Sequence, residues 1–330
     1  MLQNLIILSY FILKRITDKI EWNQVLSEVK FFDIYHTYDY HKTHSAIDGG
    51  SPVMFVYKQD GNIIALPVLE RNIINGLLDA TSVYGYAGPI SNTCDKSIFI
   101  RLYKKIILDI SRSFNYISIF SRINSEVVND SISKELFLKK GSTVTIDLKL
   151  SEEIQIQQYR KHLRYDIRRL KKENFSCDFV IPDENNINIF IEIYNSTMYS
   201  IEASDYYFFD KSYYINLFNN NLADIKMVHC TLHNEITCVG IFFFCNGIVQ
   251  YHLGANNENY NQSSPTKLML DFVRNYAYCN NYTVFNLGGG VGGNDDSLLN
   301  FKKGFSHNVN EFYLMREILN RDIYNRLSDE

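Results

Sequence analysis

The spacing of apolar and polar residues in the first half of the chain predicts a β-hairpin followed by a helix and a strand. Residues 52–57 and 63–69 are apolar runs of residues that favour β-strands, and the turn-forming segment Gln59-Asp60-Gly61-Asn62 lies between them. The segments that follow are predicted to be a Tyr/Gly-rich loop at 84–89, a helix at 96–111 and a strand at 116–120.

The second half repeats this order, with slight sequence identity. The predicted elements are strands at 226–232, 237–244 and 248–253, a helix at 265–278 and a final strand at 283–287. Because a helix joins the last two strands, we expect them to be parallel neighbours with a right-handed crossover. The repetition predicts a duplicated unit, in which an antiparallel meander is followed by a helix and one more strand.

These patterns predict an α/β (α+β) protein of two domains, each a mixed, mostly antiparallel sheet flanked by helices. We expect an N-terminal domain at 1–147 and a C-terminal, catalytic domain at 148–316. The segment 151–174 is predicted to be a charged helix. The segment 313–327 is predicted to be a strand followed by a helix, and the C-terminal helix, at 317–330, is expected to return to the first domain.

Composition limits the partners. The chain has 330 residues, is 46% hydrophobic and carries a formal net charge of −4, which is typical of a globular protein without general attraction to nucleic acid. DNA is therefore not an expected partner, and any polyanion must meet a local patch. One such patch is predicted on the helix at 159–172, where basic residues recur every four positions: Arg160, Arg164, Arg168 and Lys172. This stripe is suited to phosphates, although a solvated helix face is the simpler interpretation.

The cysteines and the N-terminus favour a cytoplasmic protein. The six cysteines show neither a C-x-x-C pair nor zinc-type spacing, so we expect reduced, mostly buried thiols. Residues 1–13 are apolar but too short to span a bilayer, and their basic residues follow the apolar run, unlike those of a signal peptide. An N-terminal extension or packing helix is expected, with peripheral contact at the inner face of a membrane as the alternative.

Two features in the second half could serve catalysis or donor binding. Ser263 and Ser264 precede Pro265 and could cap the predicted helix, whose N-terminus, with Lys267 nearby, would attract an anion. An ordinary helix cap is the alternative. His252 ends a predicted strand and is either a general base or, more simply, a hydrogen-bonded structural histidine. His36, His41 and His44 cluster in sequence, but no carboxylate pattern accompanies them, so no metal is expected.

The most specific stretch follows the last predicted strand of the second half. Three glycines at 288–290 allow a sharp turn and a close backbone approach, and they are followed by Asp295 and Asp296 and then by Phe301 and Lys302. The Lys302 ammonium could stabilise an oxyanion or a phosphate, although an ordinary surface lysine would look the same. The two aspartates are explained most simply as caps of the next helix.

Taken in order, these stretches resemble the FemABX-like branch of the GNAT acyltransferase superfamily. The resemblance extends from about residue 30 to 325, and it rests on the order of six loosely matching segments: 79–89, 164–172, 194–198, 251–255, 287–290 and 296–302. It implies two tandem GNAT-like domains that share a substrate cleft, and transfer of an acyl or aminoacyl group to an amine.

The resemblance also implies roles for individual residues. Phe301 and Lys302 match the Phe-Lys pair of the family, in which the lysine is proposed to stabilise charge at the transferring carbonyl. Acceptor phosphates would meet Arg164 or Arg168. The remaining expected substrate-binding residues are Tyr84, Tyr86, Gly288 and Gly289, and a bound donor would meet Ser264 and Lys267.

The expected function is N-acyl transfer to an amine of an amino sugar or cell-envelope polysaccharide precursor. Its acceptor would be a nucleotide-sugar or lipid-linked sugar and its donor acyl-CoA, but the segment 256–264 lacks the glycine-rich pyrophosphate loop of acetyl-CoA enzymes. The first alternative is an aminoacyl-tRNA-dependent aminoacyltransferase that acts on a peptidoglycan precursor. The second is a non-catalytic binding protein of the same fold.

Overall fold

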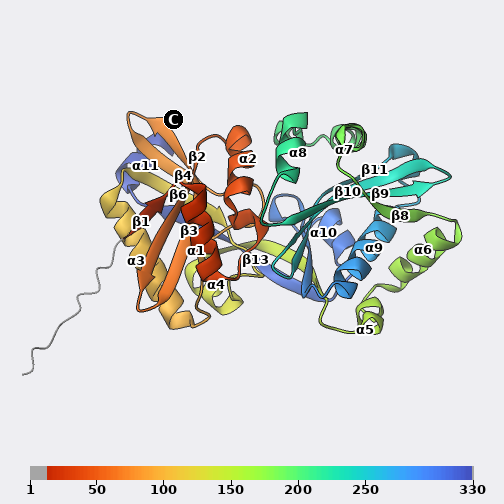
Figure 1. Ribbon diagram of the computed structural model, residues 1–330, viewed down its shortest axis with the longest axis horizontal. Helices are drawn as coiled ribbons and strands as arrows, with labels where there is room; N and C mark the ends of the chain where they lie inside the picture. Colours follow the sequence, from red (N-terminus) through yellow and green to blue (C-terminus); the bar gives the residue numbers. More distant parts are fainter. Residues whose placement is uncertain (1–12, 329–330) are drawn as a thin grey trace, which may run out of the picture. The chain divides into compact units, whose positions relative to one another are not determined.

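The computed structural model describes residues 13–328, and the chain forms two compact units (Figure 1). Unit 1 contains residues up to 139 together with 313–330, and unit 2 contains residues 140–312. The expectations for residues 1–12, including membrane contact, fall outside the described residues. Within residues 13–328, the structure contains no helix long and apolar enough to cross a membrane.

Unit 1 is built on a mixed sheet with strand order β1-β2-β3-β4-β6-β13. Its strands are β1 (Lys14–Ile16), β2 (Ser51–Gln59), β3 (Asn62–Ile74), β4 (Leu77–Thr81), β5 (Ile90–Ser91, paired with β3), β6 (Tyr116–Arg122) and the C-terminal part of β13 (Asn308–Ile318). The pairing of β4 with β6 is parallel, and the other pairings along this path are antiparallel.

The helices of unit 1 bury apolar residues against this sheet. They are α1 (Lys19–Val29), η1 (Ile34–His36), α2 (Tyr38–Asp48), α3 (Lys96–Ser113), α4 (Asp130–Leu136) and α11 (Arg321–Ser328). Helix α3 joins β4 to the parallel strand β6 and contributes Phe99, Leu102 and Ile106 to the core, where they pack with Phe55 and Leu66 of the meander.

Unit 2 repeats the arrangement. Its strand order is β7-β12-β11-β10-β9-β8, formed by β7 (Leu138–Asp147), β8 (Ser176–Val180), β9 (Asp224–Leu232), β10 (Glu235–Cys245), β11 (Ile248–Asn256) and β12 (Val284–Gly289). The strands β11 and β12, joined by a helix, are parallel, and all other pairs are antiparallel. The predicted parallel pair is therefore confirmed.

Helices cover both faces of the strands in unit 2 (Figure 1). One face carries α9 (Thr266–Cys279) and, packed against it, α6 (Lys161–Lys172); the other carries α7 (Glu184–Ser200) and α8 (Lys211–Phe218). The remaining helical segments are α5 (Glu152–Gln157), η2 (Asp205–Tyr207), η3 (Glu258–Tyr260), η4 (Val291–Gly293) and α10 (Ser297–Lys302). The core on the α9 face includes Phe242, Phe285, Leu268 and Leu299.

The expected fold class, a mixed α/β protein with two tandem units of the same design, is confirmed. In each unit an antiparallel meander leads through a helix to a parallel strand, and one further strand pairs antiparallel with that strand. The prediction of one helix at 151–174 is wrong, because α5 ends at Gln157 and α6 begins at Lys161. Between them the backbone N–H of Arg160 donates to the Gly304 carbonyl, 2.8 Å away, which sets the start of α6.

The prediction that all six cysteines are reduced thiols is also wrong. Cys177 and Cys230 lie directly opposite each other on β8 and β9 and form a disulfide. Sequence spacing could not show this pairing, because it depends on the register of two strands that are 53 residues apart. Among the described free cysteines, Cys238 and Cys245 are buried, whereas Cys94 and Cys279 are exposed.

Candidate functional site

The candidate site is built around the turn between β12 and α10 in unit 2. Gly288 has a φ of +77°, which only glycine adopts without strain. A Cβ atom at Gly289 would lie 2.5 Å from the Ser142 carbonyl oxygen, and one at Gly290 would lie 2.2 Å from the Asn294 carbonyl oxygen. Backbone conformation therefore requires the first glycine, and close backbone packing requires the other two, independently of any ligand.

Asp296 fastens this turn to α10. One carboxylate oxygen accepts from the Leu299 backbone N–H at 2.8 Å and caps the helix, while the other accepts from the Val291 N–H at 2.8 Å. Burial alone would raise the pKa of Asp296, but these backbone donors outweigh it and lower the pKa. The expectation that Asp296 caps the helix is confirmed. The same expectation for Asp295 is wrong, because Asp295 is exposed and pairs with Lys303 instead of capping the helix.

Lys302 ends α10 and points into the protein rather than into solvent. Its Nζ donates to the Gly289 carbonyl oxygen at 2.7 Å, and only 7% of the residue is exposed. The ammonium lies 6.0 Å from the centre of the Tyr251 ring. Burial lowers the pKa of Lys302 to about 8, and the Asp296 carboxylate partly opposes this effect. The simple alternative of an exposed surface lysine is thus wrong.

An ammonium group has three N–H donors. The Lys302 ammonium uses one of them in its hydrogen bond to Gly289, the one hydrogen bond that it makes with residues 13–328. Two donors are therefore left for a carbonyl, an oxyanion or a leaving oxygen. The adjacent Phe301 is half-buried and packs edge-on against Phe305, with 5.6 Å between ring centres. Phe301 thereby fixes the last turn of α10, which carries Lys302.

The structure does not bring His252 to Lys302. Consecutive strand residues Phe242 and Phe243 point to opposite faces of the sheet. Tyr251 stacks on Phe242, on the face of Lys302, whereas the His252 ring lies 4.1 Å from that of Phe243. The His252 Nε2 is also hydrogen-bonded to the Tyr213 hydroxyl at 2.8 Å. These contacts favour the structural interpretation of this histidine.

The predicted donor site at the start of α9 differs from expectation. Pro265 is the N-cap residue, and Ser264 adopts a φ of +57° without capping the helix, so the predicted serine cap is wrong. The Asn256 side chain instead accepts from the N–H and hydroxyl of Thr266. Lys267 pairs with Asp166 at 2.7 Å, and its charge is therefore already balanced. These contacts leave little positive charge for a pyrophosphate.

The remaining predicted residues divide between the two units. Tyr84 and Tyr86 lie half-buried in a loop of unit 1, where their backbone carbonyls accept from Tyr40 and Asn124. Arg164 and Arg168 lie on α6 in unit 2. Arg168 is exposed, whereas Arg164 is half-buried and its Nε makes no hydrogen bond to any residue of the described range.

The sequence placed Arg160 in the basic stripe suited to phosphates, whereas in the structure it is the N-cap residue of α6 and binds another helix. Its guanidinium donates to the side-chain and backbone oxygens of Asn300 in α10, at 3.1 and 3.2 Å. The basic helix is thus tied to the helix that carries Lys302. No sequence signal beyond the four-residue spacing indicated this contact.

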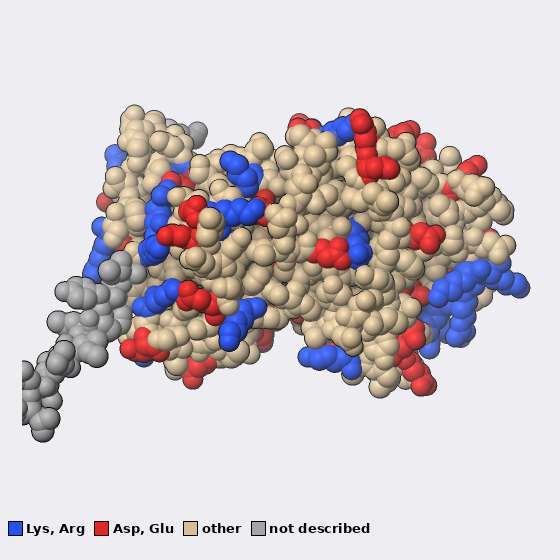
Figure 2. Space-filling view, viewed as in Figure 1, with Lys and Arg blue, Asp and Glu red and all other residues tan. Residues whose placement is uncertain are grey.

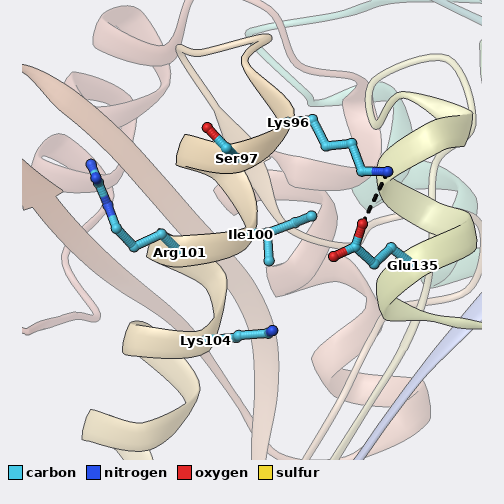
Figure 3. A pocket seen from close by; sticks show the side chains of 6 residues that line it. All are labelled: Lys96, Ser97, Ile100, Arg101, Lys104 and Glu135. Carbon is cyan, nitrogen blue, oxygen red and sulfur yellow. Dashed lines mark ion pairs between the residues drawn. The ribbon is translucent and has the colours of Figure 1, made fainter.

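An open groove between α3 and α4 of unit 1 contains none of the predicted site residues (Figure 3). It is lined by Lys96, Ser97, Ile100, Arg101, Lys104 and Glu135. Lys96 forms an ion pair with Glu135 across it. We assign no function to this groove.

Several solved structures share this fold. The crystal structure of FemX matches with a TM-score of 0.70 at 14% identity, covering 95% of this chain and 99% of the other. The C-terminal domain of a putative lysylphosphatidylglycerol synthetase from Agrobacterium fabrum matches with a TM-score of 0.58 at 12% identity, covering 94% and 96%. L-PGS from Bacillus licheniformis matches with a TM-score of 0.56 at 13% identity, covering 94% and 95%.

The FemAB family model matches residues 215–313, which include His252, the glycine turn and the Phe301–Lys302 pair. This match, together with the fold shared with FemX, agrees with the resemblance to the FemABX-like branch that the sequence indicated. No curated protein matches the chain significantly.

Proposed function

We propose that the protein transfers an aminoacyl group from aminoacyl-tRNA to an amine of a peptidoglycan precursor. The observation that carries this proposal is the buried Lys302 ammonium, held by the β12–α10 turn within the segment that matches the FemAB family. The names of the similar structures, FemX and lysylphosphatidylglycerol synthetase, favour an aminoacyl donor over acyl-CoA. The balanced charge of Lys267 also argues against a CoA pyrophosphate at α9.

In the proposed reaction the neutral acceptor amine attacks the carbonyl carbon of the aminoacyl ester. A C–N bond forms, the ester C–O bond breaks, and the ribose hydroxyl leaves as it takes up the proton that the amine loses. Lys302, with two donors left, stabilises the oxyanion that develops at the carbonyl. His252 points to the opposite face and takes no part in this step. Arg164, in the same unit as Lys302, is proposed to meet a phosphate of the acceptor.

The test is transfer of a radiolabelled amino acid from aminoacyl-tRNA to a peptidoglycan precursor that bears a free amine. The matched control acceptor has that amine acetylated. Lys302→Met keeps an unbranched apolar stem, one atom shorter, and removes the ammonium, so turnover should fall about a hundredfold while the fold persists. Turnover within a fewfold of the parent would remove Lys302 from the mechanism.

Acyl-CoA remains the competing donor, and calorimetry with acetyl-CoA separates the two. We expect no saturable binding up to millimolar concentration. Micromolar binding that is lost in a Lys267→Ala variant, together with no transfer from aminoacyl-tRNA, would overturn the proposal in favour of an acyl-CoA enzyme.

A further inference from the structure

The exposed face of α6 carries cations that the protein does not use internally. Three basic side chains near this helix are paired: Arg169 with Glu173, Lys171 with Asp271 and Lys267 with Asp166. Lys161, Arg168 and Lys172, by contrast, are exposed and form no ion pair with any residue from 13 to 328. Figure 2 shows lysine and arginine side chains gathered over this helix, although the net charge of the chain is −4.

This face also presents one large aromatic side chain among the cations. Tyr165 is 66% exposed, and on a helix it neighbours Lys161 and Arg168, four residues before and three residues after it. The apolar residues of α6, namely Leu163, Ile167 and Leu170, are all buried in the core of unit 2. Cations that flank an exposed aromatic ring are typical of surfaces that bind single-stranded nucleic acid, where a base stacks on the ring.

The basic face begins beside the candidate site. Arg160 precedes α6 and bonds to Asn300, two residues before Lys302 on α10. From this end the helix rises by about 1.5 Å per residue, so Lys172 lies about 18 Å along the axis from Arg160. A strand that follows this face would therefore have one end near α10.

We propose that the exposed face of α6 binds the single-stranded end of the donor RNA, with phosphates at Lys161, Arg168 and Lys172 and a base stacked on Tyr165. This inference rests on the proposed function and adds to it the surface that receives the donor. Arg168, which the sequence assigned to an acceptor phosphate, is here assigned to the donor. Charge-assisted contacts to phosphate supply affinity, and stacking orients the strand.

An anionic membrane is the other polyanion that this face could meet. Helices that lie on membranes insert a continuous apolar face. In α6 the apolar residues are buried in the core, and Tyr165 is the one large exposed side chain with an apolar ring. The distribution of apolar residues therefore favours RNA.

Fluorescence anisotropy with a labelled twelve-nucleotide RNA ending in CCA tests the proposal on the full chain. Substituting Lys161, Arg168 and Lys172 together by Gln should weaken binding at least tenfold. A plot of the logarithm of the association constant against the logarithm of salt concentration should also become shallower by about 2, because each of the three lost phosphate contacts contributes roughly 0.7 to the slope. Tyr165→Ala should weaken binding about tenfold, whereas Tyr165→Phe, which retains the ring, should bind as the parent does.

The matched control removes three charges from the other basic surface, with Lys96, Arg101 and Lys104 on α3 replaced by Gln. This control should bind RNA as the parent does. If both triple variants lose RNA affinity equally, the loss reflects net charge alone and the proposal is overturned. Unchanged RNA affinity in the α6 variant would also overturn it. Binding of the parent to phosphatidylglycerol vesicles but not to RNA would assign the face to a membrane.

The transfer assay separates this inference from the proposed function. If the α6 variant binds RNA normally while the parent transfers the amino acid, the docking surface is wrong and the function stands. If the parent neither binds RNA nor transfers from aminoacyl-tRNA, both fail.

Discussion

Lys302 is a lysine whose position costs folding free energy. Its ammonium has lost most of its contact with water and has gained one carbonyl acceptor, that of Gly289, in return. The pKa of about 8 records this cost, since burial disfavours the charged form. Because burial of this ammonium lowers the stability of the fold, a catalytic role explains its position better than a structural one.

Lys302 should make activity and stability depend on pH in opposite directions. As pH rises through about 8, the folded protein loses the ammonium, so turnover should fall. An unfolded chain keeps that proton up to about 10.4, so the unfolded state binds more protons in this interval and the free energy of unfolding should rise. Parallel measurements of transfer and urea unfolding between pH 7 and 9, corrected for ester hydrolysis, check this. In Lys302→Met both trends should be absent, and their persistence would assign them to another group.

At the residue scale, the sequence predicted Lys302 and Asp296 but not their surroundings. The order of glycines, acid and Phe-Lys indicated the turn and the cap, because these depend on local chain geometry. The orientation of His252 depends instead on the register of β10 and β11, which shifts between Ile241 and Phe242. The pairing of Lys267 with Asp166 joins residues 101 positions apart, and no local pattern contains that information.

At the scale of elements, α10 has only six residues and depends on its connections. Asp296 ties its start to the glycine turn, and Lys302 ties its end to Gly289. An isolated helix of this length is not stable in water, so these two side chains hold the element in place.

Asp296→Ala should therefore lower the free energy of unfolding by about 1–2 kcal/mol, the usual cost of losing an N-cap, and should reduce turnover because Lys302 loses its support. Asp295→Ala is the matched control one residue earlier, and it removes only an exposed pair with Lys303. Its stability and turnover should stay close to those of the parent. Chemical denaturation and the transfer assay measure both. Equal effects of the two substitutions would contradict the capping role.

Elements with strong local signals were predictable, and those defined by tertiary contacts were not. The meanders, α3, α9 and β12 follow from apolar periodicity and turn residues. The division of 151–174 into α5 and α6 does not, because its cause is a backbone hydrogen bond from Arg160 to Gly304, far along the chain. The helical pattern continues through the break, and only the folded structure interrupts it.

At the scale of the whole molecule, unit 1 contains a buried cluster of three histidines, His36, His41 and His44, beside the one tryptophan of the chain. The Trp22 Nε1 donates to the His36 carbonyl at 2.8 Å, and its ring lies 5.2 Å from that of His41. Burial lowers the pKa of His36 to about 4 and that of His41 to about 3, and it also lowers the pKa of His44.

Unit 1 should lose stability in mild acid. Below pH 6.5 these histidines become protonated in the unfolded chain but not in the folded unit, so each lowers the free energy of unfolding by at most about 1.4 kcal/mol per pH unit. The loss continues until the folded pKa values are reached. Trp22 fluorescence should shift to the red as the unit opens between pH 6.5 and 4. His41→Gln should make the dependence less steep by about one proton, whereas the exposed His307→Gln should not. An unchanged slope in His41→Gln would contradict this account.

The sheet of unit 1 is completed by the last strand of the chain. In β13, residues 314–318 pair with β6, the Tyr313 hydroxyl contacts Asp130, and Glu317 accepts from the Tyr103 hydroxyl. On the ribosome, the nascent chain must therefore wait for all of unit 2 to be translated, on the order of ten seconds or more at typical elongation rates. Throughout that interval β6 offers an unpaired edge to other chains, which is the setting in which chaperones act. Unit 1, although synthesised first, can thus finish folding only after unit 2 has been translated.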